Sequence, residues 1–355
     1  MIELDSTSSN QISGHILKES SVRIKLLGIG GAGCRIVSRL NISLPSIESV
    51  VLNTDKNSLE KSKVRKKIQL GESITRGWGA GGDPEIGKQV ALQEKDRLKE
   101  VLKDTDLSII ITGLGKGTGT GVSPIVAQLV KEMDSLVWGI TILPFFFEGK
   151  KRINQAQKGL KNLEKIVDAL MVIPNDNLLK KIGENLSLKE GFEKVDKFLE
   201  EVILGIGNFF HQLGFLDLDF ADVKSLLKKG NRIQVFTGRG KGKDAPQQAV
   251  KKAFSFSLYA ENFLKKTEAI IINIRGGKDL SLSEIKDTVH LVKDNLSSRG
   301  DIIVGVGIDE NLTDEIVLNL LISGKEEESD REELELKLFR SNDLEIPTFL
   351  RKGEN

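Results

Sequence analysis

The first half of the chain alternates short apolar segments with amphipathic ones. Each apolar segment has the length of a buried strand and ends abruptly in a glycine-rich or polar turn. Five segments follow this pattern, at residues 24–33, 49–55, 107–115, 135–145 and 169–176. Stretches with helical spacing lie between several of them, at residues 36–41, 83–103 and 123–133. Apolar strands that alternate with helices predict a parallel, doubly wound α/β sheet.

A long amphipathic stretch separates this half from a second unit. Apolar residues recur at helical spacing from Phe192 to Leu213, which predicts a helix that connects two domains and packs under both. Four strands are expected beyond it, at residues 232–242, 269–277, 301–309 and 315–324. We expect the last two to pair as a hairpin, because only a short polar connection separates them.

The pattern therefore predicts an α/β protein with a Rossmann-like parallel-sheet domain, a long central helix and a second, smaller α/β domain. The expected organisation is a flexible tail (1–22), a first domain (23–191), a central helix (192–216), a second domain (217–324), a charged linker (325–342) and a C-terminal peptide (343–355).

Composition excludes several classes of protein. With 52 basic and 51 acidic residues, the net charge of +1 argues against a nucleic-acid partner. The longest apolar run, residues 136–147, is too short to cross a bilayer, and the N-terminal sequence lacks the features of a signal peptide. The single cysteine, Cys34, excludes internal disulfides, and the three scattered histidines offer no metal-ligand spacing. We therefore expect a cytoplasmic protein that does not insert into a membrane.

Two glycine-rich turns carry the candidate chemistry. The first, GIGGAG at residues 28–33, fits a dinucleotide-binding turn, and it equally fits a turn that is merely tight. The second, GLGKGTGTG at residues 113–121, offers backbone N–H groups and the hydroxyls of Thr118 and Thr120 to an anion. A helix expected to open at Val122 would favour a phosphate at its N-terminus. Neither turn contains the GxxxxGK[ST] pattern of P-loop enzymes.

Further polar turns are expected at the same edge of the sheet, where open parallel sheets bind ligands. They lie at residues 53–55, 75–87, 147–152 and 173–176. A nucleotide with several phosphates would need this many polar loop tips.

These turns resemble those of the tubulin/FtsZ GTPase family. GLGKGTGTGVSP is similar to the glycine–threonine signature loop of that family. Other segments resemble those of its bacterial cell-division branch, FtsZ, in the same order: IKLLGIGGAG, LNTD, LGESITRGWGAGGDPEIG, PFFFEGKKR, VIPNDNLL and LDLDFADV. The resemblance covers residues 22–324 and the C-terminal peptide. It implies a GTP-binding domain, a central helix and a C-terminal activation domain, with GTP or GDP as ligand and Mg²⁺ held mainly by phosphates and water.

The resemblance also implies roles for individual residues. The phosphates would be lined by Gly31, Ala32 and Gly33. The diphosphate would be held by Gly115, Gly117, Thr118, Gly119 and Thr120. The γ-phosphate would be approached by Ala80, Gly81 and Gly82. Glu148 and Arg152 would contact the ribose and phosphate region, Asn175 and Asp196 would recognise guanine, and Phe192 would stack on it. Cys34, Arg35, Asn53, Thr54, Lys116 and Gly121 complete the expected nucleotide-binding set. A carboxylate suits guanine because adenine lacks the N1–H and 2-amino donors. Core packing is an equally good interpretation of Phe192.

Two acids follow the central helix in LDLDFADV. Asp219 and Asp222 match the acids of a family loop that inserts into the site of the next subunit and polarises the attacking water. Carboxylates can orient water and accept its proton. The alternative is that they cap the helix that starts near Val223. A site completed only at a head-to-tail junction would couple hydrolysis to filament assembly.

Three residues depart from the family pattern. Lys116 stands where glycine is usual, Arg35 where asparagine usually follows the first turn, and Asp217 where asparagine usually precedes the two acids. Lys116 and Arg35 add positive charge near the phosphates or point to solvent, and we expect the Lys116 ammonium near the phosphates or the subunit junction. Asp217 adds negative charge that could slow hydrolysis.

The C-terminal peptide is apolar and basic, unlike an ordinary solvated end. It resembles the peptide through which the family binds membrane-tether and division-regulator proteins, and the residues expected to bind them are Ile346, Pro347, Phe349, Leu350 and Arg351. The alternative is a terminus that packs back on its own domain.

The predicted function is therefore that of a GTP-dependent polymerising protein that forms head-to-tail filaments of the division ring at mid-cell. A second hypothesis is a family member that binds GTP and assembles but hydrolyses it slowly. A third, drawn only from GIGGAG, is a dinucleotide-dependent oxidoreductase in which Asp55, 22 residues beyond Gly33, would hold a ribose.

Overall fold

The computed structural model describes residues 22–40, 47–182, 187–209, 214–216, 218–230, 232–255, 261–296 and 300–325. Asp217, the expected N-terminal tail up to residue 21, the linker beyond Lys325 and the whole C-terminal peptide lie outside the described residues.

An eleven-stranded sheet runs through the described chain, in the order β3-β2-β1-β4-β5-β6-β8-β11-β9-β10-β7. The strands of the first unit are parallel, as the sequence pattern predicts. They are β1 (Ile24–Ile29), β2 (Ile47–Asn53), β3 (Lys66–Gln69), β4 (Leu107–Gly113), β5 (Leu136–Leu143) and β6 (Ala169–Pro174). Their carboxyl ends meet at one edge, so the turns that follow them lie together.

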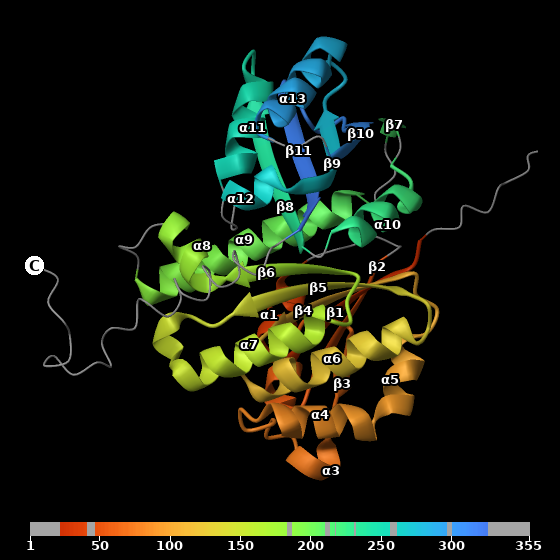
Figure 1. Cartoon of the computed structure of the whole chain (residues 1–355), viewed down its shortest axis with the longest axis vertical. Coiled ribbons are helices and arrows are strands. Elements are labelled where there is room, and N and C mark those ends of the chain that lie inside the picture. Colours follow the sequence, from red (N-terminus) through yellow and green to blue (C-terminus); the bar gives the residue numbers. More distant parts are fainter. Residues whose placement is uncertain are drawn as a thin grey trace, which may run out of the picture.

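Helices cover both faces of this parallel sheet (Figure 1). One face packs on α1 (Gly30–Arg39), α9 (Leu188–Phe209) and α10 (Phe220–Lys229). The other packs on α4 (Pro84–Gln93), α5 (Lys95–Leu102), α6 (Gly117–Lys131) and α7 (Lys150–Glu164). Short helices α2 (Lys56–Glu60), α3 (Glu72–Thr75), η1 (Phe146–Glu148) and α8 (Asn175–Ile182) lie in the connections. No described helix combines the length and apolar character that a membrane span requires.

The second unit continues the sheet through a single residue pair, Leu170 of β6 with Arg232 of β8. Its strands are β7 (Gly214–Leu216), β8 (Arg232–Lys241), β9 (Thr267–Gly276), β10 (Asp301–Ile308) and β11 (Glu315–Gly324), covered by α11 (Ala245–Ser255), α12 (Glu261–Lys265) and α13 (Leu282–Asp294). Val202 and Ile206 of α9 share one apolar core with strands of both units, including Ile111 of β4 and Ile271 of β9. The central helix therefore packs under both units, as its broad apolar face predicts.

The expected hairpin between the last two strands is wrong. β11 pairs antiparallel with β8 and β9, whereas β10 lies parallel to β9 on its far side. β11 is buried at every position after Glu315, which favours a central strand with a partner on each side. A hairpin with β10 alone would leave one edge of this apolar strand exposed.

Two helix boundaries also differ from expectation. α9 ends at Phe209, and residues 214–216, assigned to the helix from the sequence, form β7, which pairs antiparallel with β10. α6 begins at Gly117, five residues before Val122. Glycine has a low intrinsic helix propensity, so the sequence alone gives no sign that this turn is helical.

Candidate functional site

Three glycine-containing turns converge at the carboxyl edge of the parallel sheet. Gly30 starts α1 with a positive φ of 72°, and a Cβ there would lie 2.9 Å from the backbone nitrogen of Gly119 in α6. A Cβ on Gly117 would lie 2.6 Å from that of Ala80, in the turn that precedes α4. Glycine at these two positions therefore lets the N-terminus of α6 approach both neighbouring turns.

The rim of this edge leaves room for a ligand. A Cβ added at Gly31, Gly81 or Gly82 would meet no atom within 4 Å. The first N–H groups of α6 have no partner within the helix, and the helix dipole favours negative charge at that end. Backbone donors and open space thus lie at the same edge of the sheet, where phosphates are expected.

The threonines of α6 organise the turn rather than simply projecting from it. The Thr118 hydroxyl lies 2.6 Å from the hydroxyl of Thr54, which follows β2, and both side chains are buried. The Thr120 hydroxyl accepts a hydrogen bond from the Gly115 backbone N–H at 2.9 Å. Each hydroxyl retains hydrogen-bonding capacity, since it can donate one bond and accept two. They hold the backbone donors of the turn in position.

Two buried amides at this edge have an atom with no protein partner. Neither Nδ2 of Asn53, at the end of β2, nor Oδ1 of Asn175, at the start of α8, contacts a hydrogen-bonding group among the described residues. Buried polar atoms are nearly always satisfied, so each atom is available to a partner that the described residues do not supply. A polar ligand fits this requirement.

Asp196 of α9 is almost fully buried, at 5% exposure. Its carboxylate accepts from Arg35 at 3.2 Å and from Arg39 at 2.5 Å, both on α1. Arg35 therefore contacts the expected guanine-recognising acid rather than pointing to solvent. Sequence reasoning missed Arg39, although its position four residues after Arg35 places both on one helix face.

The start of α7 closes one side of the site. Glu148 accepts from Arg152 at 2.5 Å and, through its other oxygen, from the Phe145 backbone N–H at 3.0 Å. The two residues expected near the ribose thus lie together and are bonded to each other.

Three other expected residues have distinct places. Lys116 is the N-cap residue of α6 and its side chain is exposed. The Cys34 thiol is buried beneath α1 and donates to the Gly28 carbonyl at 3.4 Å, and burial raises its pKa to about 12. Phe192 lies within α9, and its side chain is outside the described part of the structure.

Asp219 and Asp222 form a capping box at the start of α10. Asp219 accepts from the Ala221 N–H at 3.2 Å, and Asp222 accepts from the Asp219 N–H at 3.1 Å. The capping interpretation is therefore confirmed for both acids, not for Asp222 alone. Because each bond uses one oxygen, both carboxylates retain acceptor sites for water.

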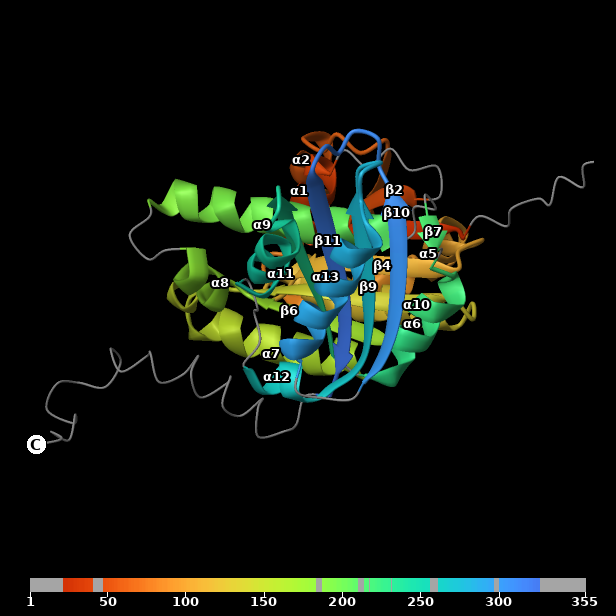
Figure 2. The ribbon, with the colours of Figure 1, turned by 90° about the horizontal axis from the view of Figure 1, so that it is seen from above.

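These acids lie at the opposite edge of the sheet from the glycine turns. Phe220 and Lys224 of α10 line a cavity of about 340 Å³ with Arg23, Asp106 and other residues at the amino ends of β1, β4 and β5. Figure 2 shows α10 and the start of α9 at opposite sides of the molecule. A strand the length of β4 spans roughly 23 Å, so the acids cannot reach the glycine turns of their own chain.

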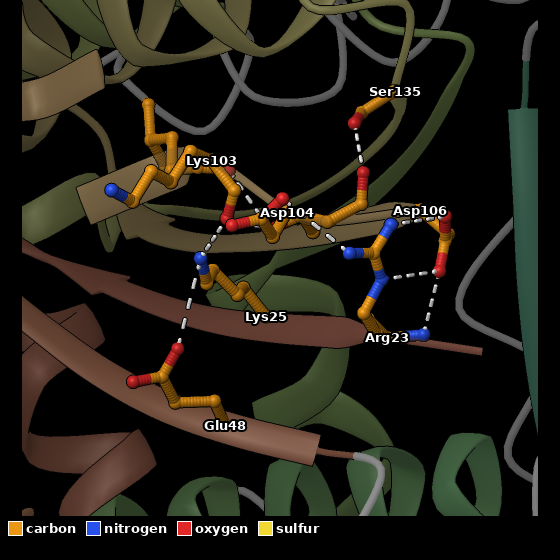
Figure 3. A network of polar contacts seen from close by, with 9 residues as sticks. Arg23, Lys25, Glu48, Lys103, Asp104, Asp106 and Ser135 are labelled. Carbon is orange, nitrogen blue, oxygen red and sulfur yellow. Dashed lines mark hydrogen bonds and ion pairs between the residues drawn. The ribbon is translucent and has the colours of Figure 1, made fainter. Parts of the chain in front are cut away.

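A polar network braces this amino edge (Figure 3). Asp106 accepts from the backbone N–H of Arg23 at 2.8 Å and from its guanidinium at 3.2 and 3.3 Å. These hydrogen bonds lower the pKa of Asp106, against an opposing effect of burial. Lys25 donates to the Lys103 carbonyl at 2.5 Å, and burial lowers its pKa. The network ties β1 to the connection that enters β4.

The described residues contain no cluster of three or more histidine, cysteine, aspartate or glutamate side chains that could hold a metal ion. Asp55, which the oxidoreductase hypothesis requires as a ribose ligand, instead caps α2 by accepting from the Ser58 N–H at 3.1 Å.

Comparison with known proteins identifies two matching families. Residues 23–183 match "Tubulin/FtsZ family, GTPase domain", and residues 232–326 match "FtsZ family, C-terminal domain". An FtsZ dimer from M. jannaschii is 34% identical, with a TM-score of 0.78 over 87% of this chain and 90% of that chain. The GDP-bound CetZ1 monomer of Haloferax volcanii is 20% identical, with a TM-score of 0.76 over 91% of this chain and 100% of that chain. The GTPγS-bound CetZ2 protofilament of the same organism gives 20% identity and a TM-score of 0.75, over 91% and 99% of the two chains.

Proposed function

This chain belongs to the tubulin/FtsZ family, and we propose that it binds GTP, assembles head-to-tail and hydrolyses GTP at the junction between subunits. We further propose that these filaments act in cell division, at a ring at mid-cell in the cytoplasm. The C-terminal peptide, including Ile346, Pro347, Phe349, Leu350 and Arg351, would recruit membrane-tether and division-regulator proteins.

One observation carries the proposal: the glycine turns and the acid pair lie at opposite edges of the same sheet. A second copy placed head-to-tail brings Asp219 and Asp222 toward the glycine turns of its neighbour. A contact between two different surfaces of the same chain does not close on itself and extends into a filament. The same arrangement makes hydrolysis depend on assembly.

The buried polar groups fit a guanine nucleotide. Each oxygen of Asp196 accepts from one arginine and retains a lone pair, so the carboxylate can still accept from guanine N1–H and the 2-amino group. The buried side-chain carbonyl oxygen of Asn175 has no partner among the described residues and could accept from a further donor. The N-terminal N–H groups of α6 suit the diphosphate.

Mg²⁺ fits the phosphate side if it is bound through the nucleotide. The turns at Gly31, Ala80–Gly82 and Gly117 contribute backbone donors rather than metal ligands, and Mg²⁺ commonly retains waters and binds through phosphate oxygens. When bound, the ion would neutralise charge that develops on the phosphates. The chain's own contribution is to hold the phosphates with N–H groups and to orient water with Asp219 and Asp222 of the next subunit.

Complementation between two inactive variants tests the proposal. In Asp219→Ala/Asp222→Ala the nucleotide turns are intact and the acids are missing, whereas in Asp196→Ala the acids are intact and nucleotide binding is weakened. We expect each variant alone to lose GTP turnover by about 100-fold or more, and an equimolar mixture to regain activity. Phosphate release and sedimentation with GTP and Mg²⁺ are the measurements.

The control is Asp287→Ala, which removes an exposed acid from α13 and should leave turnover unchanged. Circular dichroism shows whether each variant keeps its helical content, so that unfolding after loss of the α10 capping box can be distinguished from loss of activity in a folded chain. A mixture that stays as inactive as its components, while each variant remains folded, would contradict hydrolysis between subunits. Assembly with GTP but with negligible phosphate release from the unmodified chain would instead support the slow-hydrolysis hypothesis, and Asp217→Asn would then test its cause.

A further inference from the structure

A long groove of about 1520 Å³ runs beside α1, on the side that faces β2 and α2. At one end, Gly31 and Arg35 border the expected nucleotide site. The other end is formed by residues 61–66, which connect α2 to the edge strand β3. The charged side chains of the lining are predominantly basic: Arg35, Arg39, Lys61, Lys63, Arg65 and Lys66, against Glu48 and Glu200.

Half of these basic groups are already compensated. Arg35 and Arg39 pair with Asp196, and Lys66 pairs with Glu48 at 2.8 Å. Lys61, Lys63 and Arg65 are exposed and have no ion pair among the described residues. The far end of the groove therefore carries three uncompensated positive charges.

The backbone that carries these three cations is fixed. Ser62 and Val64 alternate with them and are buried. The Ser62 hydroxyl lies 2.5 Å from that of Ser38 on α1 and accepts from the Val64 N–H at 3.2 Å. An anchored segment with a cation at every second residue suits a polyanionic chain.

The sequence contains one strongly acidic segment, EEESDREELEL at residues 326–336. It has seven acidic residues and a single basic one, Arg331. We propose that this acidic segment of a second copy of the chain binds in the basic groove.

The distance across the sheet favours a second copy over the same chain. The strand register connects Gly324, which immediately precedes Lys325, to Lys66 through Arg232, Leu170, Gly139, Ile110, Leu27 and Val50. These seven strand spacings amount to about 34 Å. Figure 2 likewise places α12, which contacts Gly324, and α2, which precedes the groove segment, at opposite sides.

A fully extended chain from Lys325 to Leu336 spans at most about 40 Å. Within one molecule most of the acidic segment would therefore be needed to cross from Lys325 to the groove. Few of its carboxylates would then reach Lys61, Lys63 and Arg65. A neighbouring copy can supply the whole segment to the groove.

Binding between two copies does not depend on GTP. Its consequence for filaments does rest on the proposed function: repeated along two filaments, a weak contact of this kind becomes multivalent and links them side by side. The groove would then determine lateral association, separately from the head-to-tail junction.

Zero-length cross-linking tests the contact directly. An equimolar mixture of unlabelled and ¹⁵N-labelled full-length protein is treated, without added nucleotide, with a carbodiimide that joins lysine to carboxylate. We expect peptides that join Lys61 or Lys63 to residues 326–335 and that combine light and heavy partners. The Lys66–Glu48 pair, which lies within one chain, is the internal control and must remain unmixed.

Unmixed cross-links between the groove and residues 326–335 would overturn the proposal by showing that the segment binds its own chain. Cross-links from this segment that spread equally over exposed lysines elsewhere, such as Lys251 and Lys286, would overturn it by showing no preference for the groove.

A labelled peptide of residues 326–336 provides the second measurement, by fluorescence anisotropy with the full-length chain. Lys61→Glu/Lys63→Glu/Arg65→Glu should weaken its binding about tenfold or more, and added salt should weaken binding to the unmodified chain. The matched control, Lys251→Glu/Lys252→Glu/Lys286→Glu, makes the same charge change on α11 and α13 and should bind as the unmodified chain does. Equal weakening by both variants, or equal binding of a peptide with glutamines in place of the glutamates, would refute a specific groove.

Failure of the proposed function would leave these results unchanged, because neither measurement requires GTP or filaments. If the contact exists, light scattering and electron microscopy of assembled protein should show single filaments for the groove variant and paired ones for the control. Paired filaments in the groove variant would contradict the lateral role.

Discussion

Two arginines one helical turn apart hold the buried carboxylate of Asp196. Arg35 and Arg39 approach different oxygens, which fixes the plane of the carboxylate while leaving lone pairs for a ligand. Arg35 stands where the resemblance leads one to expect asparagine, so this chain orients the acid proposed to recognise guanine with a charged group. Orientation by the arginines and acceptance from guanine are compatible roles of one carboxylate.

Asp196→Asn should therefore reduce the preference for guanine over adenine nucleotides while leaving the chain folded. Asparagine keeps the size of the side chain but replaces one acceptor oxygen with an NH2 donor, so the charge and the pairing of two oxygens with the two guanine donors are lost. We expect GDP affinity to fall about 10- to 100-fold, as for a lost hydrogen bond to a charged group, with little change for ADP. Isothermal titration with both nucleotides measures this, and Asp287→Asn is the control. An equal loss for GDP and ADP would assign Asp196 a purely structural role.

At the scale of elements, strand entry at the amino edge depends on a charge pair. Arg23, just before β1, binds Asp106, just before β4, through three hydrogen bonds, two from its guanidinium and one from its backbone. They lower the pKa of Asp106. The pair contributes stability above the ordinary carboxyl range and loses it as the pH falls through the lowered pKa of the folded state. Its exposure to solvent keeps the contribution modest.

Asp106→Asn should consequently flatten the acid side of the stability profile. The substitution keeps a hydrogen-bond acceptor but removes the titrating group, so the unmodified chain should lose more stability than the variant between neutral pH and pH 3 or so. Urea unfolding followed by circular dichroism at several pH values measures the difference. Parallel profiles for the two proteins would show that other carboxylates dominate acid unfolding.

Local sequence patterns predicted those helices and strands whose position depends on one apolar face or on one edge of the sheet. The parallel strands, the glycine turns at their carboxyl ends and the central helix follow from apolar periodicity and turn residues. The start of α6 at Gly117 did not follow from the sequence pattern, because a run of glycine and threonine is typical of a loop. Tertiary packing against α4 accompanies its helical conformation.

Contacts between distant residues were the part that the sequence could not predict. The position of β11 between β8 and β9 depends on competition among strands, not on the short connection from β10. Arg39 and Asp196 are separated by 157 residues, and only folding shows that they meet. Loop chemistry is local, so the sequence could place the candidate residues on the turns at the carboxyl edge, whereas the pairing of Asp196 with Arg39 is not local.

At the scale of the whole molecule, the most exposed aromatic side chain among the described residues, Trp78, lies beside the carboxyl edge. Trp78 is 82% exposed, yet its backbone is fixed by a hydrogen bond from its N–H to the Thr75 carbonyl at 2.9 Å and by a bridge with Asp55. It lies two residues before Ala80, in the turn expected near the γ-phosphate. A rigid, exposed tryptophan at this edge is well placed to be covered by the next subunit, and tryptophan is enriched among residues that dominate interface energies.

Trp78→Ala should therefore impair assembly without impairing nucleotide binding. We expect the critical concentration for GTP-dependent sedimentation to rise about tenfold or more, since truncation of a central interface aromatic costs 2 kcal/mol or so. GDP affinity should be unchanged, because the Trp78 side chain is exposed to solvent rather than packed into the converging turns. Leu282→Ala is the matched control, since Leu282 is 85% exposed on the remote helix α13. In the unmodified chain, Trp138 is buried at 0% exposure, so a blue shift of tryptophan emission on assembly would report burial of Trp78. An unshifted emission together with an unchanged critical concentration would place Trp78 outside the junction, and the head-to-tail contact would then have to form on other parts of this edge.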